Sequence, residues 1–362
     1  MKSLNIGELT ARIPIIQGGM GVRISLSGLA AAVANEGGIG VIATAGLGMF
    51  EPDLFTAFLE ANSRALRKEI RKAREMTKGL LGVNIMVALS NYAELVRTAV
   101  EEKIDIIFSG AGLPLNLPEF VTNTGGTKLA PIVSSARAAG IIIRKWFGKY
   151  GYLPDAFVVE GPLAGGHLGF KKEQIEDPGF SLEKLIPEVI AEVRPYEEKH
   201  QRRIPVIAAG GIYTGADICR FMNMGASGVQ MATRFVCTDE CDASAEFKQA
   251  FLESKKDDLV IIQSPVGMPG RAIQNQFLED VRAGMKKPFS CPYHCIITCN
   301  PETSPYCIAL ALASACNGKL NRGFAFAGAN AYRCDRIISV RELFAELSAE
   351  YNAAAQTQTA RL

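Results

Sequence analysis

The 362 residues are 48% hydrophobic, which is enough to bury one large core, or a core with a smaller appendage. The 39 lysines and arginines nearly balance the 37 aspartates and glutamates, so the formal charge of +2 gives no strong field for nucleic acid or an acidic membrane surface. No run approaches the roughly 18 apolar residues that span a bilayer, and the N-terminal segment has no apolar signal. We therefore expect a cytoplasmic protein that binds neither nucleic acid nor a membrane.

Eight short runs rich in Val, Ile and Leu alternate with longer helical stretches. Continuous apolar runs between glycine or polar residues indicate strands buried on both faces, as in repeated strand–helix–strand units. The predicted strands are 13–17, 39–43, 81–87, 104–108, 128–133, 155–160, 204–209 and 228–231. The predicted helices between and after them are 25–36, 52–76, 91–102, 135–147, 182–199, 214–224 and 241–254.

Eight such units within about 250 residues predict an α/β protein, a TIM (β/α)8 barrel, rather than an open doubly wound sheet. No G-x-G-x-x-G follows the first strand, which argues against a classical dinucleotide-binding fold. The alternation stops after residue 285, where a stretch rich in Pro, Cys and Asn leads to two further helical segments, 304–316 and 339–352. We therefore predict a barrel over 1–285 and a cysteine-rich C-terminal extension over 286–362 that packs on it.

The segment 204–235 contains the seventh and eighth predicted strands. The first of them ends in Gly210 and Gly211, and the second ends in "QMATR". Glycine lets backbone N–H groups approach an anion, and a following helix N-terminus adds the positive end of its dipole. In TIM barrels the loops after these two strands are the usual phosphate site. Two glycines can also serve a tight turn alone, but the paired signal favours a phosphate site.

Four motifs, in this order, point to a known family. They are "PIIQGGMG" (14–21), "GVNIMV" (82–87), "EGPLAGGHLG" (160–169) and "AAGGIYTGADICRFMNMGASGVQMATRFVCT" (208–238). Together they resemble the nitronate monooxygenase family, formerly called 2-nitropropane dioxygenases, which also contains the flavin-dependent enoyl-acyl carrier protein reductases. The resemblance implies a TIM barrel that binds FMN.

The resemblance also implies which residues hold FMN. Gln17, Gly18, Gly19 and Met20 would line the flavin ring, Asn84 would contact it, Ser134 or Ser135 would approach its edge, and Gly210, Gly211, Gln230, Met231 and Thr233 would hold the phosphate end. Asn84 has an alternative role as a core amide, Met20 as ordinary packing, and each serine as a helix cap. The family commonly has glycine before the threonine, where this chain has Ala232; a methyl group is tolerated there if the backbone φ is negative.

His167, one of only three histidines, lies in the glycine-rich loop after the sixth predicted strand. This places it at the same mouth as the phosphate site, and Gly165 and Gly166 would let the loop pass close to a flat cofactor. In the resembling family this histidine is the catalytic group, and an imidazole exchanges protons near neutrality. We count Glu160 among the cofactor-binding residues, together with Gly165 and Gly166. Its carboxylate would orient the loop or His167; alternatively, it would only cap N–H groups of the loop.

Four of the nine cysteines, Cys291, Cys295, Cys299 and Cys307, fall within 17 residues. Four thiolates from one loop could hold an iron–sulfur cluster or a tetrahedral zinc ion. Their spacing matches neither the common C-x2-C zinc pattern nor the ferredoxin run, and free cysteines often act as small buried hydrophobes. Both interpretations stay open; of the metals, we favour iron–sulfur because an electron relay beside a flavin would make functional sense.

Three functions follow from these patterns. The first is the FMN-dependent oxidation of small alkyl nitronates, with His167 as acid/base. The second, favoured by "QGGM" and "GVNIMV", is the reduction of an acyl thioester of the enoyl-acyl carrier protein type, with NAD(P)H as reductant. The third is a non-redox barrel enzyme in which "AAGG" binds a substrate phosphate. The protein could form a homodimer.

Overall fold

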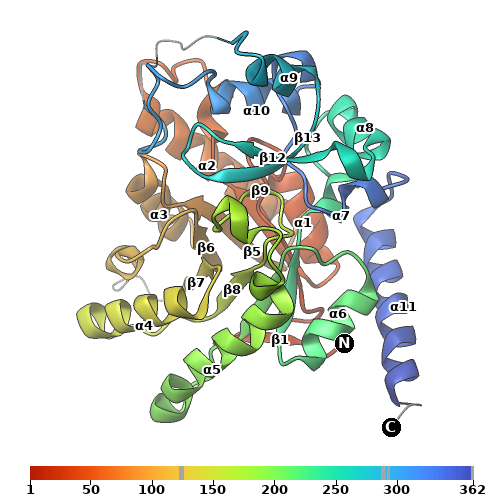
Figure 1. Ribbon diagram of the computed structural model, residues 1–362. Helices are drawn as coiled ribbons and strands as arrows, with labels where there is room; N and C mark the ends of the chain where they lie inside the picture. The colour runs from red at the N-terminus through yellow and green to blue at the C-terminus, as the bar shows by residue number, and fades with distance from the viewer. Residues whose placement is uncertain (122–125, 287–290, 292–293, 360–362) are drawn as a thin grey trace.

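The computed structural model describes residues 1–121, 126–286, 291 and 294–359 (Figure 1). Eight parallel strands close into a barrel in the order β10-β11-β3-β4-β5-β6-β7-β8. They are β3 (Ile15–Gln17), β4 (Ile39–Ala43), β5 (Leu80–Met86), β6 (Ile106–Gly110), β7 (Lys128–Val133), β8 (Phe157–Glu160), β10 (Val206–Ala209) and β11 (Gly228–Met231). Each predicted strand overlaps one of these, so the predicted TIM barrel is confirmed.

The barrel helices lie outside the strands (Figure 1). They are α1 (Ser27–Asn35), α2 (Phe58–Met76), α3 (Tyr92–Glu101), α4 (Ala136–Tyr150), α5 (Leu182–His200), α6 (Gly215–Asn223), the one-turn α7 (Thr233–Val236) and α8 (Ala245–Glu253). All seven predicted barrel helices overlap a helix of this set; the short α7 was not anticipated. Within the described ranges, no helix is long and apolar enough to cross a membrane.

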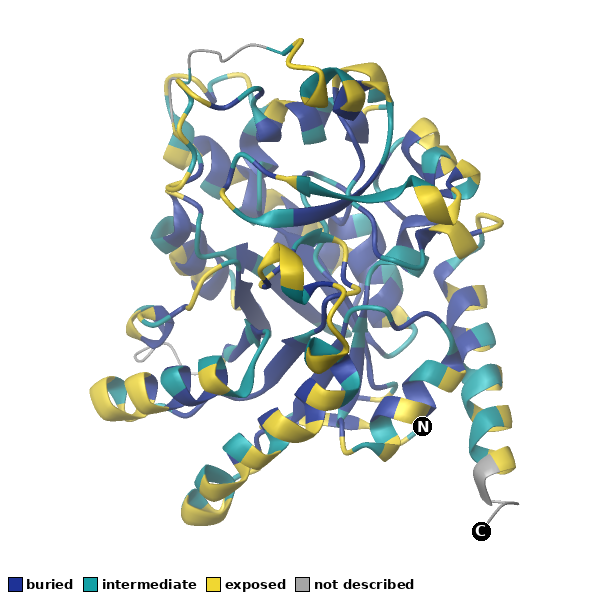
Figure 2. Ribbon diagram, viewed as in Figure 1, coloured by how far each residue is buried: buried dark blue, intermediate teal, exposed yellow. Residues whose placement is uncertain are grey.

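The strands are buried because helices cover one of their faces and the barrel interior covers the other, as Figure 2 shows by their dark blue colour. All five residues of β4 are buried. Ile16, Ile39 and Phe108 belong to an interior cluster that also contains Leu4 and Ile6. These last two lie on an N-terminal hairpin, β1 (Leu4–Ile6) and β2 (Leu9–Ala11), that the sequence patterns had not indicated. The hairpin therefore closes the end of the barrel where the strands begin.

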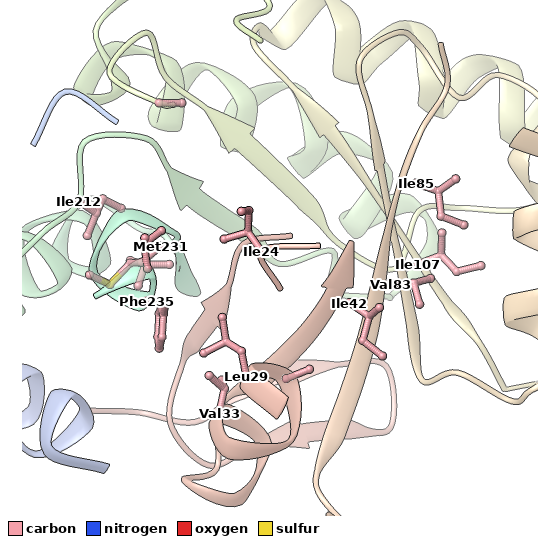
Figure 3. Packing of buried hydrophobic residues seen from close by; sticks show 14 of the residues in the cluster. Ile24, Leu29, Val33, Ile42, Val83, Ile85, Ile107, Ile212, Met231 and Phe235 are labelled. Atoms are coloured by element: carbon pink, nitrogen blue, oxygen red, sulfur yellow. The ribbon is translucent and has the colours of Figure 1, made fainter. Parts of the chain in front are cut away.

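A larger apolar cluster lies between the strands and the surrounding helices. Figure 3 shows part of it, with Leu29 and Val33 of α1 near Ile42 of β4. These three side chains are completely buried. Burial of apolar area on this scale is the main stabilising contribution to such a fold, at roughly 25 cal/mol per Å².

A second sheet crosses the mouth of the barrel. It joins β12 (Leu259–Gln263), β13 (Pro269–Ile273) and the two-residue β9 (Gly166–His167), all antiparallel. Gly270 of β13 pairs directly with His167. The alternating strand–helix pattern had not predicted this sheet, which holds the backbone of the His167 loop against a segment about a hundred residues later.

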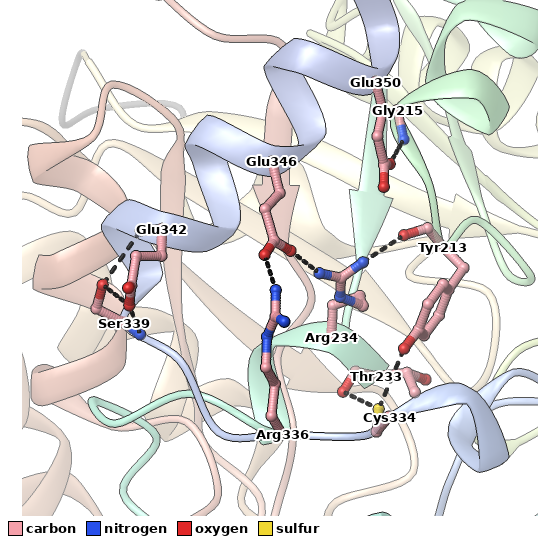
Figure 4. A network of polar contacts seen from close by, with 10 residues as sticks. All are labelled: Tyr213, Gly215, Thr233, Arg234, Cys334, Arg336, Ser339, Glu342, Glu346 and Glu350. Carbon is pink, nitrogen blue, oxygen red and sulfur yellow. Dashed lines mark hydrogen bonds and ion pairs between the residues drawn. The ribbon is translucent and has the colours of Figure 1, made fainter.

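The C-terminal part of the chain contains α9 (Gln276–Arg282), α10 (Ile308–Cys316) and α11 (Val340–Thr359). Helix α11 packs along α6, and a Cβ at Gly215 would overlap its Leu347 carbonyl oxygen, so the close approach requires glycine there. Figure 4 shows the polar side of this contact: Glu346 of α11 accepts from Arg234 at 2.7 Å and also pairs with Arg336. The helix is thereby tied to the segment that follows β11.

Candidate functional site

A cavity of about 260 Å³ opens where the barrel strands end. Gly18 follows β3, Ala45 follows β4, Glu160 ends β8, Gly210 follows β10 and Ala232 follows β11, and all of them line it. The carboxyl ends of the strands form the usual site of TIM-barrel enzymes. The location predicted from the strand ends therefore coincides with a cavity.

Most of the predicted site residues meet in this cavity. Those that line it are Gly18, Gly19, Met20, Asn84, Glu160, Gly165, Gly166, His167, Gly210, Gly211, Gln230, Met231 and Thr233. Gln17, Ser134 and Ser135 are not among the lining residues.

The three residues outside the lining have other contacts. Gln17 is completely buried, and its carboxamide oxygen accepts the Val41 N–H at 2.9 Å, which joins β3 to β4. Ser135 is the N-cap of α4 and accepts the Ala138 N–H at 3.2 Å. A Cβ at Gly169 would lie 2.5 Å from the Ser134 hydroxyl, so this serine packs against the His167 loop. Ser135 thus has the capping contact given above as its alternative.

One wall of the cavity depends on glycine at position 19. A Cβ there would overlap the Cβ of Asn84 on β5, so only glycine lets the two segments lie this close. The side-chain amides of Asn84 and Gln230 make no hydrogen bond to any of the described residues. Two amides facing an otherwise largely apolar cavity are available to bind a ligand.

The loop after β10 contributes two adjacent glycines to the lining of the cavity. Gly210 and Gly211 have φ of +91° and +84°, which side chains rarely adopt. The Asn330 side chain donates to the Gly211 carbonyl at 2.8 Å and fixes this loop. Thr233 begins α7 after Ala232, whose φ is −126°. The methyl group at 232, where the family commonly has glycine, is therefore accommodated without strain.

Among the described residues, the side chain of His167 makes one hydrogen bond and one ring contact. Its Nε2 lies 2.8 Å from the hydroxyl of Ser264, which also accepts the Val266 N–H at 3.2 Å. The ring of Phe326 meets the imidazole edge-on at 4.9 Å between centroids. Burial lowers the pKa of His167 to about 4, so the imidazole is neutral at neutral pH.

Glu160 is the other titratable group in the cavity. Burial raises the pKa of its carboxyl to about 7, and the carboxyl has no hydrogen-bond partner among the described residues. The lining that the structure describes contains no lysine or arginine. An anion placed beside His167 would thus have no fixed positive side chain next to it.

The sequence patterns did not reveal three residues that shape the site. Ser264 and Phe326 contact His167, and Arg271 of β13 donates 2.7 Å hydrogen bonds to the carbonyls of Pro162 and Ala164 in the His167 loop. All three come from segments beyond residue 260 that reach the mouth only through the second sheet. For Arg271, the sequence offered one signal of a special role: it is a lone arginine in an otherwise uncharged strand, "PGRAI".

The four cysteines of the extension come near one another without forming a metal centre. Cys291, Cys295, Cys299 and Cys307 are free thiols. Burial, with smaller contributions from the other three thiols, raises the pKa of Cys295 to about 12. Throughout the described ranges, no group of three or more His, Cys, Asp or Glu residues could hold a metal ion. The predicted iron–sulfur or zinc site therefore has no structural support.

The cavity fits the FMN that the motifs imply. Gly210 and Gly211 line the cavity with positive φ, while Gly166 has no atom within 4 Å of the position a Cβ would take. Amides at Asn84 and Gln230 could bind polar edges of a ring system, and the apolar walls suit its faces. A mostly apolar cavity whose lining includes two adjacent glycines after β10 suits a flat ring that carries a phosphate tail.

Comparison with known proteins agrees with this geometry. The chain is 29% identical over 307 residues to a probable nitronate monooxygenase of Staphylococcus aureus, covering 75% of this chain and 78% of the relative. A second probable nitronate monooxygenase, from Staphylococcus haemolyticus, is 27% identical over 312 residues, covering 76% of this chain and 79% of the relative.

Two solved structures share the fold. FabK from Thermotoga maritima has a TM-score of 0.75 and 28% identity, covering 97% of this chain and 96% of that chain. A nitroalkane oxidase from Streptomyces ansochromogenes has a TM-score of 0.73 at 21% identity, covering 96% of this chain and 97% of that chain, and supports the fold alone. The family described as nitronate monooxygenase matches residues 2–350, and the chain belongs to this family of oxidoreductases, for which FMN is the implied cofactor.

Proposed function

We propose that the protein oxidises small alkyl nitronates, formed from nitroalkanes in its own cavity, with His167 as the acid/base group. The observation that carries this proposal is a partly buried imidazole, neutral at pH 7, at the mouth of a barrel and lining a cavity suited to FMN. When bound, FMN supplies the electron acceptor and the reaction with dioxygen.

FMN would be held by the residues already described. The backbone of Gly210 and Gly211, with Thr233, would bind the phosphate. Gly18 to Met20 and Asn84 would line the ring. Gln230, Met231, Gly165, Gly166 and Glu160 complete the proposed set of cofactor-binding residues. No arginine takes part in the lining that the structure describes, so phosphate binding would depend on backbone N–H groups.

His167 would act as a base through Nδ1. When Nε2 carries the proton, it donates a hydrogen bond to the Ser264 hydroxyl. Nδ1 then keeps its lone pair. A neutral imidazole can take the α-proton of a neutral nitroalkane. The imidazolium formed by that transfer then faces the nitronate anion. This supplies the positive charge that the cavity lacks before the reaction.

A second function is favoured by the identity of one structural match. FabK is 28% identical to this chain, whereas the nitroalkane oxidase of similar fold and coverage is 21% identical. FabK is an enoyl reductase. In that reaction His167 would donate a hydrogen bond to the carbonyl oxygen of an acyl thioester, and NAD(P)H would be the reductant.

Rapid mixing of the FMN-loaded enzyme separates the two functions. For nitronate oxidation, we expect nitroethane to bleach the flavin absorbance without oxygen, and His167→Ala to slow this about a hundredfold or more while FMN stays bound. For thioester reduction, we expect NAD(P)H to bleach the flavin and crotonyl thioester to restore it. Bleaching by NAD(P)H with no response to nitroethane or propyl nitronate would rule out the first function.

A further inference from the structure

A second, smaller cavity of about 50 Å³ adjoins the first at His167. Val22, Ala45, Met86, His167 and Leu312 line both. A molecule that reacts beside His167 can therefore extend from the first cavity into the second, which we call the side cavity.

The walls of the side cavity come from two distant parts of the chain. Leu54 and Phe58 belong to the segment that leads into α2, while Ile296, Ile308 and Ala309 come from the C-terminal extension. The described lining contains no Lys, Arg, Asp or Glu. An ionised group in this cavity would lose its hydration without gaining a partner of opposite charge, so the walls select an uncharged occupant.

Two amide side chains interrupt these apolar walls, and they differ in one respect. Asn62 is satisfied, because it accepts from the Gly48 N–H at 3.0 Å and donates to the Phe58 carbonyl at 2.7 Å. Asn91 is only 4% exposed, and it is the N-cap residue of α3 without the usual side-chain capping bond. Its carboxamide has no hydrogen-bond partner among the described residues. The amide lines the cavity, so an occupant can form the hydrogen bond that the protein does not supply.

We propose that the side cavity holds the tail of the substrate, an uncharged, unbranched chain that carries a hydrogen-bonding group within reach of Asn91. A volume of 50 Å³ accommodates about three to five groups the size of a water molecule or a methylene. This inference rests on the proposed function for one point, namely that the reacting carbon lies beside His167. It specifies the substrate class as a neutral compound with a short straight tail.

The first test is a series of straight-chain nitroalkanes, from nitroethane to 1-nitrohexane, with the FMN-loaded enzyme. We expect kcat/KM to rise about fourfold for each added methylene until the side cavity is full, and then to level off. At the optimal length, a terminal hydroxyl should raise kcat/KM further and a terminal carboxylate should lower it below the value for nitroethane. A flat series in the wild-type enzyme would overturn the proposal.

Two variants on α10 locate the effect. Ala309 is 8% exposed and lines the side cavity, so Ala309→Leu should fill it and reduce the ratio of kcat/KM for 1-nitrohexane over nitroethane to about one. The next residue, Leu310, is 48% exposed and outside the lining, so Leu310→Ala should keep the wild-type ratio. Asn91→Leu should keep the dependence on chain length and remove the advantage of the terminal hydroxyl. An unchanged ratio in Ala309→Leu would contradict the assignment.

A binding measurement separates this inference from the proposed function. Straight-chain alcohols from 1-propanol to 1-hexanol do not react, so calorimetry with the FMN-loaded enzyme measures binding alone, and comparison with Ala309→Leu isolates the contribution of the side cavity. Affinity that rises with chain length in the wild type and not in Ala309→Leu would support the cavity, even if no nitroalkane or enoyl thioester were turned over. An absence of turnover would contradict only the proposed function. If substrates are turned over, but neither alcohol affinity nor kcat/KM depends on chain length, only the assignment of the side cavity is contradicted.

Discussion

The hydroxyl of Ser264 lies 2.8 Å from Nε2 of His167, although 97 positions separate the two residues. Ser264 is 3% exposed, and its oxygen is held in turn by the Val266 N–H at 3.2 Å. The imidazole is therefore oriented by a group that is itself fixed. This contact fixes the orientation of the ring, and the direction in which the Ser264 hydroxyl bonds sets which ring nitrogen carries the proton.

Ser264→Ala should lower kcat about fivefold and leave the affinity for FMN unchanged, because one hydrogen bond that orients the imidazole is lost, worth about 1 kcal/mol. The measurement is steady-state kinetics together with an FMN titration. Ser264→Thr keeps the hydroxyl and serves as the matched control, with most of the activity expected to return. Wild-type kcat in Ser264→Ala would show that orientation by this serine is not needed.

The pH dependence of kcat/KM should show a base whose pKa is lower than that of an ordinary histidine. Burial lowers the pKa of His167 to about 4, so the neutral base persists well into the acid range and its loss begins only as the pH falls towards 4. A histidine at its ordinary pKa near 6.5 would lose about tenfold by pH 5.5. Since Glu160 has a pKa of about 7 in the same cavity, the profile should also be recorded in Glu160→Gln. An inflection near pH 6.5 in that variant would contradict a neutral, buried His167.

Glu160 should make the stability of the FMN-free protein depend on pH in a direction opposite to that of most carboxylates. Burial raises the pKa of its carboxyl to about 7, above the ordinary 4.5, so the folded state binds the proton more tightly than the unfolded state. Its contribution to stability is present below pH 4.5 and is lost as the pH rises through 7. Urea denaturation should show that Glu160→Gln gains about 1–3 kcal/mol more, relative to wild type, at pH 8 than at pH 4.5. An equal difference at both pH values would mean that the carboxyl is solvated.

Gly211→Ala should weaken FMN binding at least tenfold, because the residue has a φ of +84° and a Cβ would lie 2.8 Å from the Cβ of Leu163. Gly284→Ala is the matched control. It has a similar φ of +70° but no atom within 4 Å of the added Cβ, and it lies outside the cavity lining. Both should lose about 1 kcal/mol of stability from the strained backbone. Equal FMN affinity in the two variants would show that the Gly210–Gly211 loop does not hold the phosphate.

The sequence predicted those parts of the protein that local patterns determine. Parallel strands buried on both faces leave continuous apolar runs, and functional groups gather where such strands end, so the barrel and the place of His167 could be predicted. The contact between His167 and Ser264 could not, because it depends on the pairing of β9 with β13, and two-residue strands carry no periodicity. Ser135 shows a different limit. A serine before a helix suits both a cap and a cofactor contact, and its 3.2 Å bond to Ala138 becomes visible only in the folded chain.

Arg271 should prove to be the residue that holds the His167 loop in place. It is 7% exposed, burial lowers its pKa, and its Nη1 donates to the carbonyls of both Pro162 and Ala164 at 2.7 Å. Arg271→Met would leave two carbonyls without a donor, so we expect the free energy of unfolding to fall by about 3 kcal/mol. We also expect kcat to fall, because the loop leads directly into His167.

The control for Arg271→Met is Arg282→Met, an exposed arginine with one 3.2 Å bond to Gln274, which should change stability by less than about 0.5 kcal/mol. Arg271→Lys should restore part of the stability, since a lysine can donate to both carbonyls but lacks the planar guanidinium. Denaturation with urea and the kinetics of each variant provide the measurements. If Arg271→Met kept wild-type kcat while losing stability, the loop would hold its catalytic geometry through β9 and β13 alone, and Arg271 would serve the fold rather than the position of His167.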